Sequence, residues 1–275
     1  MNISTRASTG NWRTPAIVLI CGGLALTIAL GTRHSFGLFL LPMTMDLEWN
    51  RQTFAFAMAL QNLVYGIAQP FTGMIADRFG AARVMVAGTV VYALGLLWMA
   101  NPGGGTDFSL SAGVMIGIAL SCSGFSIVFG VVGRAFPPEK RSMALGIAGA
   151  AGSLGQFVML PFGQLLINEL GWHNALMTLA LVVLVIAPLS AAMVEDGSTQ
   201  PASQSRQSVP EALREAGHHQ GFWLLCLAYT VCGFQVMFIS IHFPAYMVDQ
   251  HMSPEVGMRS EEHTSELQSL AYLVC

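Results

Sequence analysis

Arg33 and His34 stand inside the first long apolar stretch of the chain, residues 15–41. An ionisable side chain at such a place is costly in lipid, and it is therefore a candidate for binding or transport. The apolar stretches between residues 15 and 194 contain no Asp or Glu, so Arg33 has no evident counter-ion there. A carboxylate substrate could supply that partner through two parallel hydrogen bonds. His34 could carry a proton.

Two simpler interpretations of this pair stay open. The long side chain of Arg33 could extend to the lipid headgroups while its stem stays in the apolar layer. Arg33 precedes Leu41, the end of the stretch, by about 12 Å of helix, so this reach would be stretched. His34 could be an interfacial histidine with no part in transport.

Other apolar stretches carry polar residues at intervals of three, four or seven, which places each set on one helix face. A further glutamine lies in the fifth stretch. Such sets could line a substrate site, or they could form a seam of hydrogen bonds between packed helices. The candidate substrate-binding residues are therefore Arg33, His34, Asn62, Tyr65, Gln69, Gln156, Gln235 and His242.

The composition places these residues in a membrane. Hydrophobic residues make up 53% of the 275-residue chain and charged residues only 10%, whereas soluble domains are roughly 25% charged. A bilayer core of ~30 Å requires ~20 apolar residues in a helix. We predict an all-α polytopic membrane protein whose apolar stretches are Pro15–Leu41, Thr53–Ala76, Val84–Ala100, Ser109–Gly133, Met143–Ile167, His173–Val194 and Gly221–Val248.

The distribution of Lys and Arg predicts the direction of these helices. The connections after odd-numbered stretches carry only Arg51, whereas the N-terminus and the other connections carry the cations listed below. Cytoplasmic connections are the ones enriched in cations, so we predict a cytoplasmic N-terminus and a cytoplasmic linker, 195–220. A capping-box pattern at 208–211 predicts a short surface helix in that linker. The cytoplasmic cations are Arg6, Arg13, Arg78, Arg83, Arg134, Lys140, Arg141, Arg206 and Arg214.

An internal repeat supports this topology. Residues 70–80 and 161–171 align without a gap, and Pro, Phe and Gly coincide in the two copies. The first copy ends the second stretch and the other copy ends the fifth, which lie on opposite sides of the predicted membrane. Such an arrangement is an inverted repeat of three plus three helices, an architecture of membrane transporters.

The connection after the second stretch reads Gly73-Met-Ile-Ala-Asp-Arg-Phe-Gly-Ala-Ala-Arg83. Gly80 permits a tight turn, and Asp77 could hold Arg83 or cap a neighbouring helix. This segment resembles the signature of the major facilitator superfamily in residues, spacing and position. The resemblance implies a fold of two six-helix halves, with this loop as a latch between the halves in one conformation. The latch residues would be Gly73, Asp77, Arg78, Gly80 and Arg83.

The fifth stretch carries glycine at every third residue, from Gly146 to Gly155. The superfamily's antiporter signature in this helix usually contains a Gly-Pro pair, which is missing here. Small residues let helices approach closely, so we predict that these glycines serve helix packing.

Two segments resemble the monocarboxylate and oxalate–formate branch of this superfamily: the sequence Arg-His-Ser-Phe-Gly-Leu-Phe that begins at Arg33, and His242–Asp249. The resemblance implies a secondary active transporter that carries a small organic anion by alternating access. It also implies a second cation, in an eighth helix, and a coupling proton or counter-anion. An alternative is a proton-coupled exporter of drugs or metabolites, but the fourth stretch lacks the Arg and Gln that many such exporters carry.

Other classes of protein find little support. Lys140 is the only lysine and lies in a connection, which excludes a retinal protein. A cytoplasmic N-terminus argues against a receptor coupled to guanine-nucleotide-binding proteins. No motif indicates an enzyme, a metal site, a cofactor or nucleic-acid binding. We expect a monomer in the bacterial inner membrane, in contact with lipid and a small anion.

The last residues differ in kind from the rest. Arg259–Ser269 reads as the in-frame translation of a sequencing-library adapter, and such segments are excluded from fold reasoning. We therefore expect the natural sequence to stop near Met258. The alternative is a natural polar tail. The second hypothesis for the function is that the chain as it stands is a truncated fragment without transport function. The predicted division is a six-helix half at 1–194, the linker at 195–220, a seventh helix of an incomplete second half at 221–258 and a non-native tail at 259–275.

Overall fold

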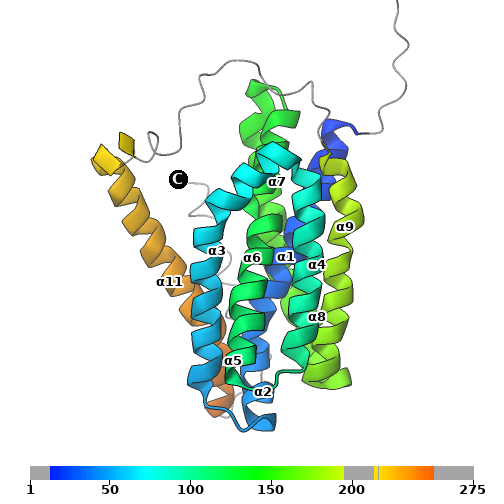
Figure 1. Ribbon diagram of the computed structural model, residues 1–275, viewed down its shortest axis with the longest axis vertical. Coiled ribbons are helices and arrows are strands. Elements are labelled where there is room, and N and C mark those ends of the chain that lie inside the picture. The colour runs from blue at the N-terminus through cyan, green and yellow to red at the C-terminus, as the bar shows by residue number, and fades with distance from the viewer. Residues whose placement is uncertain (1–12, 195–213, 216, 251–275) are drawn as a thin grey trace, which may run out of the picture.

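The computed structural model describes residues 13–194, 214–215 and 217–250, and every regular element within them is helical (Figure 1). The predicted surface helix at 208–211 and the tail at 259–275 lie outside the described residues, and the predicted division into domains stays a prediction. The elements are α1 (Pro15–His34), η1 (Ser35–Phe39), α2 (Leu40–Asp46), α3 (Arg51–Phe79), α4 (Ala81–Ala100), α5 (Gly105–Phe108), η2 (Ser109–Met115), α6 (Ile116–Ser123), α7 (Phe125–Ala135), α8 (Pro138–Leu184), α9 (Ile186–Leu189), η3 (Ser190–Met193) and α11 (Gln220–Asp249).

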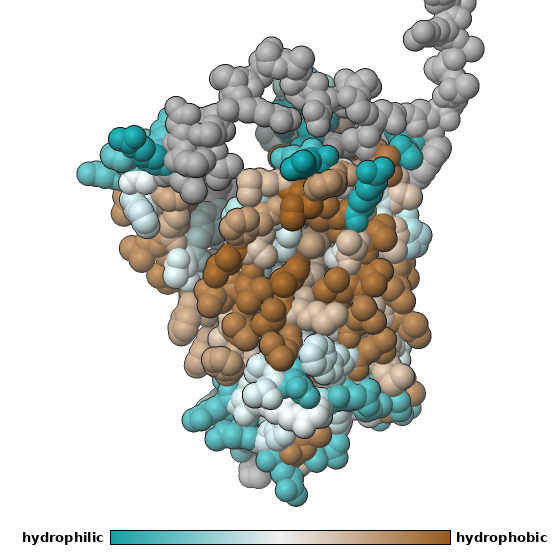
Figure 2. Space-filling view, in the orientation of Figure 1, coloured by the Kyte–Doolittle hydropathy of each residue, from teal (hydrophilic) through white to brown (hydrophobic). Residues whose placement is uncertain are grey.

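An apolar band crosses the middle of the bundle on the face shown in Figure 2. Figure 2 shows hydrophobic residues in a broad band, with hydrophilic residues gathered above and below it. This confirms the predicted all-α membrane fold, whereas the split into six helices plus a seventh stays a prediction. Five stretches of the described residues are long and apolar enough to cross a membrane: Pro15–Asp46, Ala81–Ala100, Gly105–Ala135, Pro138–Met193 and Gln220–Asp249.

The bundle has two ends, which we name after an acidic residue at each. The Asp46 end holds the turn between α2 and α3, the reversal of the chain at Gly171 and the end of α11. The Asp77 end holds the turn between α3 and α4, and the starts of α1, α8 and α11. Among the described cations, Arg51 lies at the Asp46 end, and the Asp77 end holds Arg13, Arg78, Arg83, Arg134, Lys140 and Arg141.

The two copies of the repeat share a local structure. Gly80 and Gly171, which the repeat aligns, have φ angles of 94° and 75°, values that glycine adopts without steric cost. Gly80 separates α3 from α4, and Gly171 separates the two arms of α8. Their aligned prolines, Pro70 and Pro161, both lie inside the preceding helix. The repeat is therefore confirmed at these positions, and its two reversals lie at opposite ends of the bundle.

Glycines bring α1 against α8, its most extensive partner. A Cβ atom on Gly31 would lie 2.4 Å from the carbonyl oxygen of Gly155, so the two backbones meet directly. Beside them, the Thr27 hydroxyl donates to the Ala151 carbonyl oxygen at 2.7 Å. This confirms close packing at the end of the glycine series, whereas Gly146 at its start faces open space.

α11 meets the bundle mainly at the Asp46 end, where it packs against η1 and α2. Its side chains are mostly exposed from Gln220 to Gln235, whereas Ala245 near its other end is buried. In Figure 1, α11 stands apart from α3 at the top of the view and joins the bundle at the bottom. The helix therefore passes Arg33 near its own middle.

Candidate substrate-binding site

Arg33 lies in the last turn of α1 and faces two other helices. Its Nη2 donates to Oδ1 of Asn62 in α3 and lies 3.4 Å from Sδ of Met237 in α11. The guanidinium carbon lies 5.0 Å from the centre of the Tyr65 ring, within the range of a cation–π contact. The Arg33 side chain thus joins α1, α3 and α11 at one point.

The charge of Arg33 is not neutralised by these contacts. The Nε atom is buried and has no hydrogen-bond partner among the described residues. The ion pairs described within the chain, Arg51–Asp249 and Arg134–Asp77, lie at the two ends of the bundle and do not include Arg33. Leaving a buried donor unsatisfied costs about 1–3 kcal/mol, and more when the group is charged. The guanidinium therefore keeps an unused donor that an acceptor of negative charge could satisfy.

Asn62 is held in one orientation by its own helix. Its Nδ2 donates to the Met58 carbonyl oxygen at 2.7 Å, so its Oδ1 is the atom left to accept from Arg33. The neighbouring Gln61 points elsewhere, because its Nε2 donates to the Ala112 carbonyl oxygen at 2.7 Å and ties α3 to η2. Asn62 therefore positions the guanidinium while leaving its charge uncompensated.

A small cavity adjoins Arg33 between α1, η1, α3 and α11. Of the eight predicted substrate-binding residues, Arg33, His34 and Asn62 line it. Its walls are otherwise mainly apolar, which strengthens electrostatic interactions within it. The full lining is Arg33, His34, Phe36, Gly37, Met58, Gln61, Asn62, Met237, Ser240 and Ile241.

The predicted polar faces continue from this cavity. The Nδ1 atom of buried His34 lies 2.9 Å from the Leu30 carbonyl oxygen. Because a carbonyl oxygen only accepts, this nitrogen carries a hydrogen. Tyr65 and Gln69 follow on the same face of α3, one and two turns beyond Asn62. The polar face predicted on α3 therefore runs from Arg33 toward the Asp77 end.

The other predicted residues lie apart from the cavity. Gln156 is half-buried in α8, and Gln235 is exposed on α11. His242 packs its ring against Phe238 of the same helix, with 5.0 Å between ring centres. None of these three lines the space beside Arg33, so a role in binding stays a prediction for them.

Sequence reasoning missed the apolar wall of the site. Met58, Met237 and Ile241 line the cavity, but in the sequence they are ordinary members of apolar stretches. Their role becomes visible only when α3 and α11 are placed beside α1. Methionine side chains are flexible and polarizable, so this part of the wall can change its shape.

The predicted latch residues lie together at the Asp77 end. Asp77 Oδ1 lies 3.6 Å from Nη1 of Arg134, at the end of α7. The sequence offered Arg83 or the start of a neighbouring helix as the partner of Asp77, but Arg83 Nη1 lies 3.5 Å from the Phe79 carbonyl oxygen. Arg78 stacks over the Phe79 ring. Arg134 was not identified from the sequence because nothing in spacing alone brings the ends of α3 and α7 together. The role of these residues as a latch stays a prediction.

Comparisons with known proteins identify the family of the chain. The family model of the Major Facilitator Superfamily matches residues 11–273. An uncharacterized MFS-type transporter of Bacillus subtilis, YcxA, is 26% identical over 240 residues, which cover 82% of this chain and 56% of that protein. Monocarboxylate transporter 11 of Mus musculus is 29% identical over 184 residues, 66% of this chain and 39% of that protein. The chain thus spans 56% or less of the length of these two relatives.

Solved structures show the same fold. A bacterial homolog of the human lysosomal transporter Spinster, in an inward-facing and unoccupied conformation, superposes with a TM-score of 0.74 at 17% identity. The match covers 96% of this chain and 61% of that one. A D-xylose–proton symporter gives a TM-score of 0.57 at 13% identity, covering 94% of this chain and 67% of that one. At these identities the likeness concerns the fold.

Proposed function

Because the chain belongs to the major facilitator superfamily, we propose that it acts in a secondary active membrane transporter for a small organic anion, a mono- or dicarboxylate. The anion crosses by alternating access, in which a central site opens to one side of the membrane at a time. The name of the mouse relative, Monocarboxylate transporter 11, supports this class of substrate. No observation of the described residues favours a sugar or a drug in its place.

The observation that carries the proposal is the unpartnered Nε of Arg33. Among the described residues, a neutral amide supplies the one oxygen that bonds to this buried guanidinium, which therefore keeps its charge in an apolar setting. Carboxylates pair with arginine through two parallel charge-assisted bonds, which are about twice as strong as neutral ones. A carboxylate that bonds to Nε and Nη2 together would share or replace the Asn62 contact. The substrate thereby becomes the counter-ion that the described residues do not supply.

The proposal includes an orientation. The concentration of cations at the Asp77 end supports a cytoplasmic position for that end and for the N-terminus. A bacterial inner membrane, a monomeric state and a coupling proton or counter-anion complete the proposal. The Asp46 end then faces the outside of the cell, and Arg33 lies between it and the cytoplasmic latch.

Uptake into proteoliposomes tests the proposed substrate class. Radiolabelled formate, lactate and oxalate are compared with D-xylose and choline, which carry no negative charge. We expect uptake of carboxylates from a protein that extends this chain to the length of its relatives, and none from the 275-residue chain alone. Uptake of xylose or choline without carboxylates would contradict the anion proposal. Uptake by the short chain would contradict the proposal that it is a fragment.

A further inference from the structure

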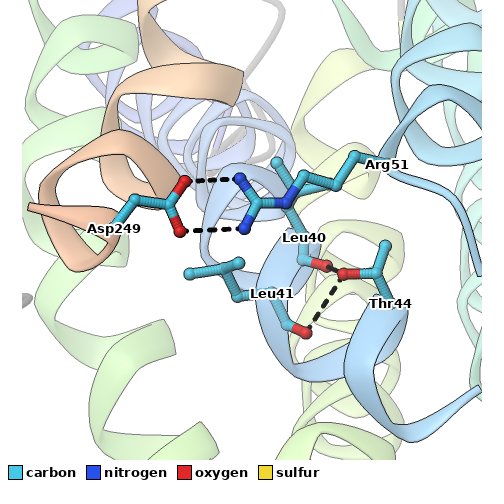
Figure 3. Close-up of polar contacts among 5 residues, drawn as sticks. All are labelled: Leu40, Leu41, Thr44, Arg51 and Asp249. Atoms are coloured by element: carbon cyan, nitrogen blue, oxygen red, sulfur yellow. Dashed lines mark hydrogen bonds and ion pairs between the residues drawn. The ribbon is translucent and has the colours of Figure 1, made fainter. Parts of the chain in front are cut away.

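α11 is joined to the bundle at its last residue by an ion pair. Arg51 Nη1 donates to Asp249 Oδ2 at 2.6 Å, and Nη2 donates to Oδ1 at 2.9 Å, as the parallel dashed lines in Figure 3 show. Arg51 begins α3 and Asp249 ends α11. The side chains are 48% and 44% exposed, so water and salt reach both partners. The pair is well oriented but poorly shielded.

Each charge of this pair lies at the unfavourable end of its own helix. The first turn of a helix carries partial positive charge, which opposes Arg51, and the last turn carries partial negative charge, which opposes Asp249. α3 has a separate cap, since the Asn50 side chain accepts from the Gln52 backbone nitrogen at 3.1 Å. Neither charge therefore stabilises its own helix. The favourable interaction of each charge is mainly the ion pair with the other.

A close backbone contact lies between this pair and the substrate site. A Cβ atom on Gly37 of η1 would lie 2.0 Å from the Ser240 carbonyl oxygen of α11. One turn away, Met237 contacts Arg33. Three successive contacts of α11 thus lead from the surface of the Asp46 end to Arg33, with Gly37 and Ser240 in the middle.

We propose that Arg51 and Asp249 form a clasp that closes the Arg33 site at the Asp46 end and releases when the site opens there. Its purpose rests on the proposed function, but its mechanics depend only on α11 and α3. A solvent-exposed pair opposed by both helix dipoles is weak enough to break in every cycle. Its two parallel bonds nevertheless return α11 to one position when they reform. Gly37 allows the backbone contact that seals the space below the clasp.

Distance measurements on the reconstituted 275-residue chain test the clasp without any substrate. Spin labels are attached at Met45→Cys and Gln250→Cys, two exposed positions on α2 and just beyond α11, with the native cysteines replaced. Double electron–electron resonance spectroscopy then gives the distribution of distances between the two labels. Arg51→Gln should lower the ratio of the short to the long distance roughly two- to fivefold, the range for an exposed ion pair. A control pair at Met45→Cys and Leu170→Cys should not respond, because both positions belong to the part of the bundle without α11.

A charge exchange and a glycine substitution complete the test. Arg51→Asp combined with Asp249→Arg places both charges at favourable helix ends, so it should restore the short distance at least to its original population. Gly37→Ala should lengthen the distance with the ion pair intact, because the added Cβ meets Ser240. An unchanged distribution in Arg51→Gln, or no recovery in the exchanged variant, would overturn the clasp. Because no anion is used, these results do not depend on the proposed substrate.

Discussion

Arg33 and Arg51 are two arginines of the same bundle that differ in burial and in the charge of their partners. Within the described part of the chain, the buried Nε of Arg33 has no partner, and its Nη2 donates to the neutral amide of Asn62. Arg51 is about half exposed and has a bidentate carboxylate partner, Asp249. If stability alone governed their placement, the carboxylate would be more valuable beside the buried cation. The protein instead leaves the buried cation open.

The difference indicates what each arginine is for. A ligand of opposite charge can bind strongly at a buried charge that lacks a partner, because no residue already makes that ion pair. An exposed pair contributes ~0–1 kcal/mol and is screened by salt, so it suits a contact that must form and break. We therefore connect Arg33 with binding and Arg51 with movement.

Replacing Arg33 should produce the largest effect. Arg33→Gln keeps a polar side chain but removes the charge, and we expect carboxylate uptake by the extended protein to fall at least about 100-fold, the loss typical of a buried charge pair. Arg141→Gln is the matched control, since Arg141 is exposed at the start of α8. If uptake by Arg33→Gln stays within a few fold of uptake by the unchanged protein, Arg33 has no role in binding.

A lysine at the same position separates charge from geometry. Arg33→Lys keeps the cation but offers a compact ammonium in place of the planar fork. We expect roughly tenfold weaker uptake, because one of two parallel bonds is lost at about 1–1.5 kcal/mol. Initial uptake rates over a range of lactate concentrations measure this. Equal rates for Lys and Arg would show that only charge matters, and the bidentate geometry would have to be abandoned.

Salt should affect the clasp more than the site, and this is the smallest expected effect. Raising NaCl from about 0.05 M to about 0.5 M shortens the screening length to a few ångströms. The Met45–Gln250 label distance should then shift toward the long population by no more than about fivefold. In Arg51→Gln the same salt change should do nothing. A salt response of equal size in that variant would show that other charges hold α11.

The sequence was sufficient to predict a feature where a residue type at that position had a single physical explanation. Gly80 and Gly171 need positive φ, and the repeat that contains them could be read from a short alignment. Arg33 was identifiable because a cation in an apolar stretch is unusual. The partners of charged residues were not predictable, because Arg134 meets Asp77 and Arg51 meets Asp249 only after distant helices pack together. Met237 and Gly37 gave no signal, because their roles depend on where α11 lies.

Asn62→Asp gives the most direct test of the central claim, that no described residue is a counter-ion for Arg33 and that the substrate supplies one. The substitution is nearly isosteric and places a fixed carboxylate against the guanidinium. Thermal unfolding is followed with and without lactate or oxalate, using chloride at equal ionic strength as the reference and Asn168→Asp, at an exposed site bonded to Gln164, as the control. We predict that carboxylates raise the Tm of the unchanged chain and of the control. Asn62→Asp gains an ion pair with Arg33 but loses the Nδ2 hydrogen bond to the Met58 carbonyl oxygen. We therefore expect its Tm without ligand to be at least that of the unchanged chain, and we expect no response to carboxylates. A destabilised Asn62→Asp variant that still responds to carboxylates would contradict the account.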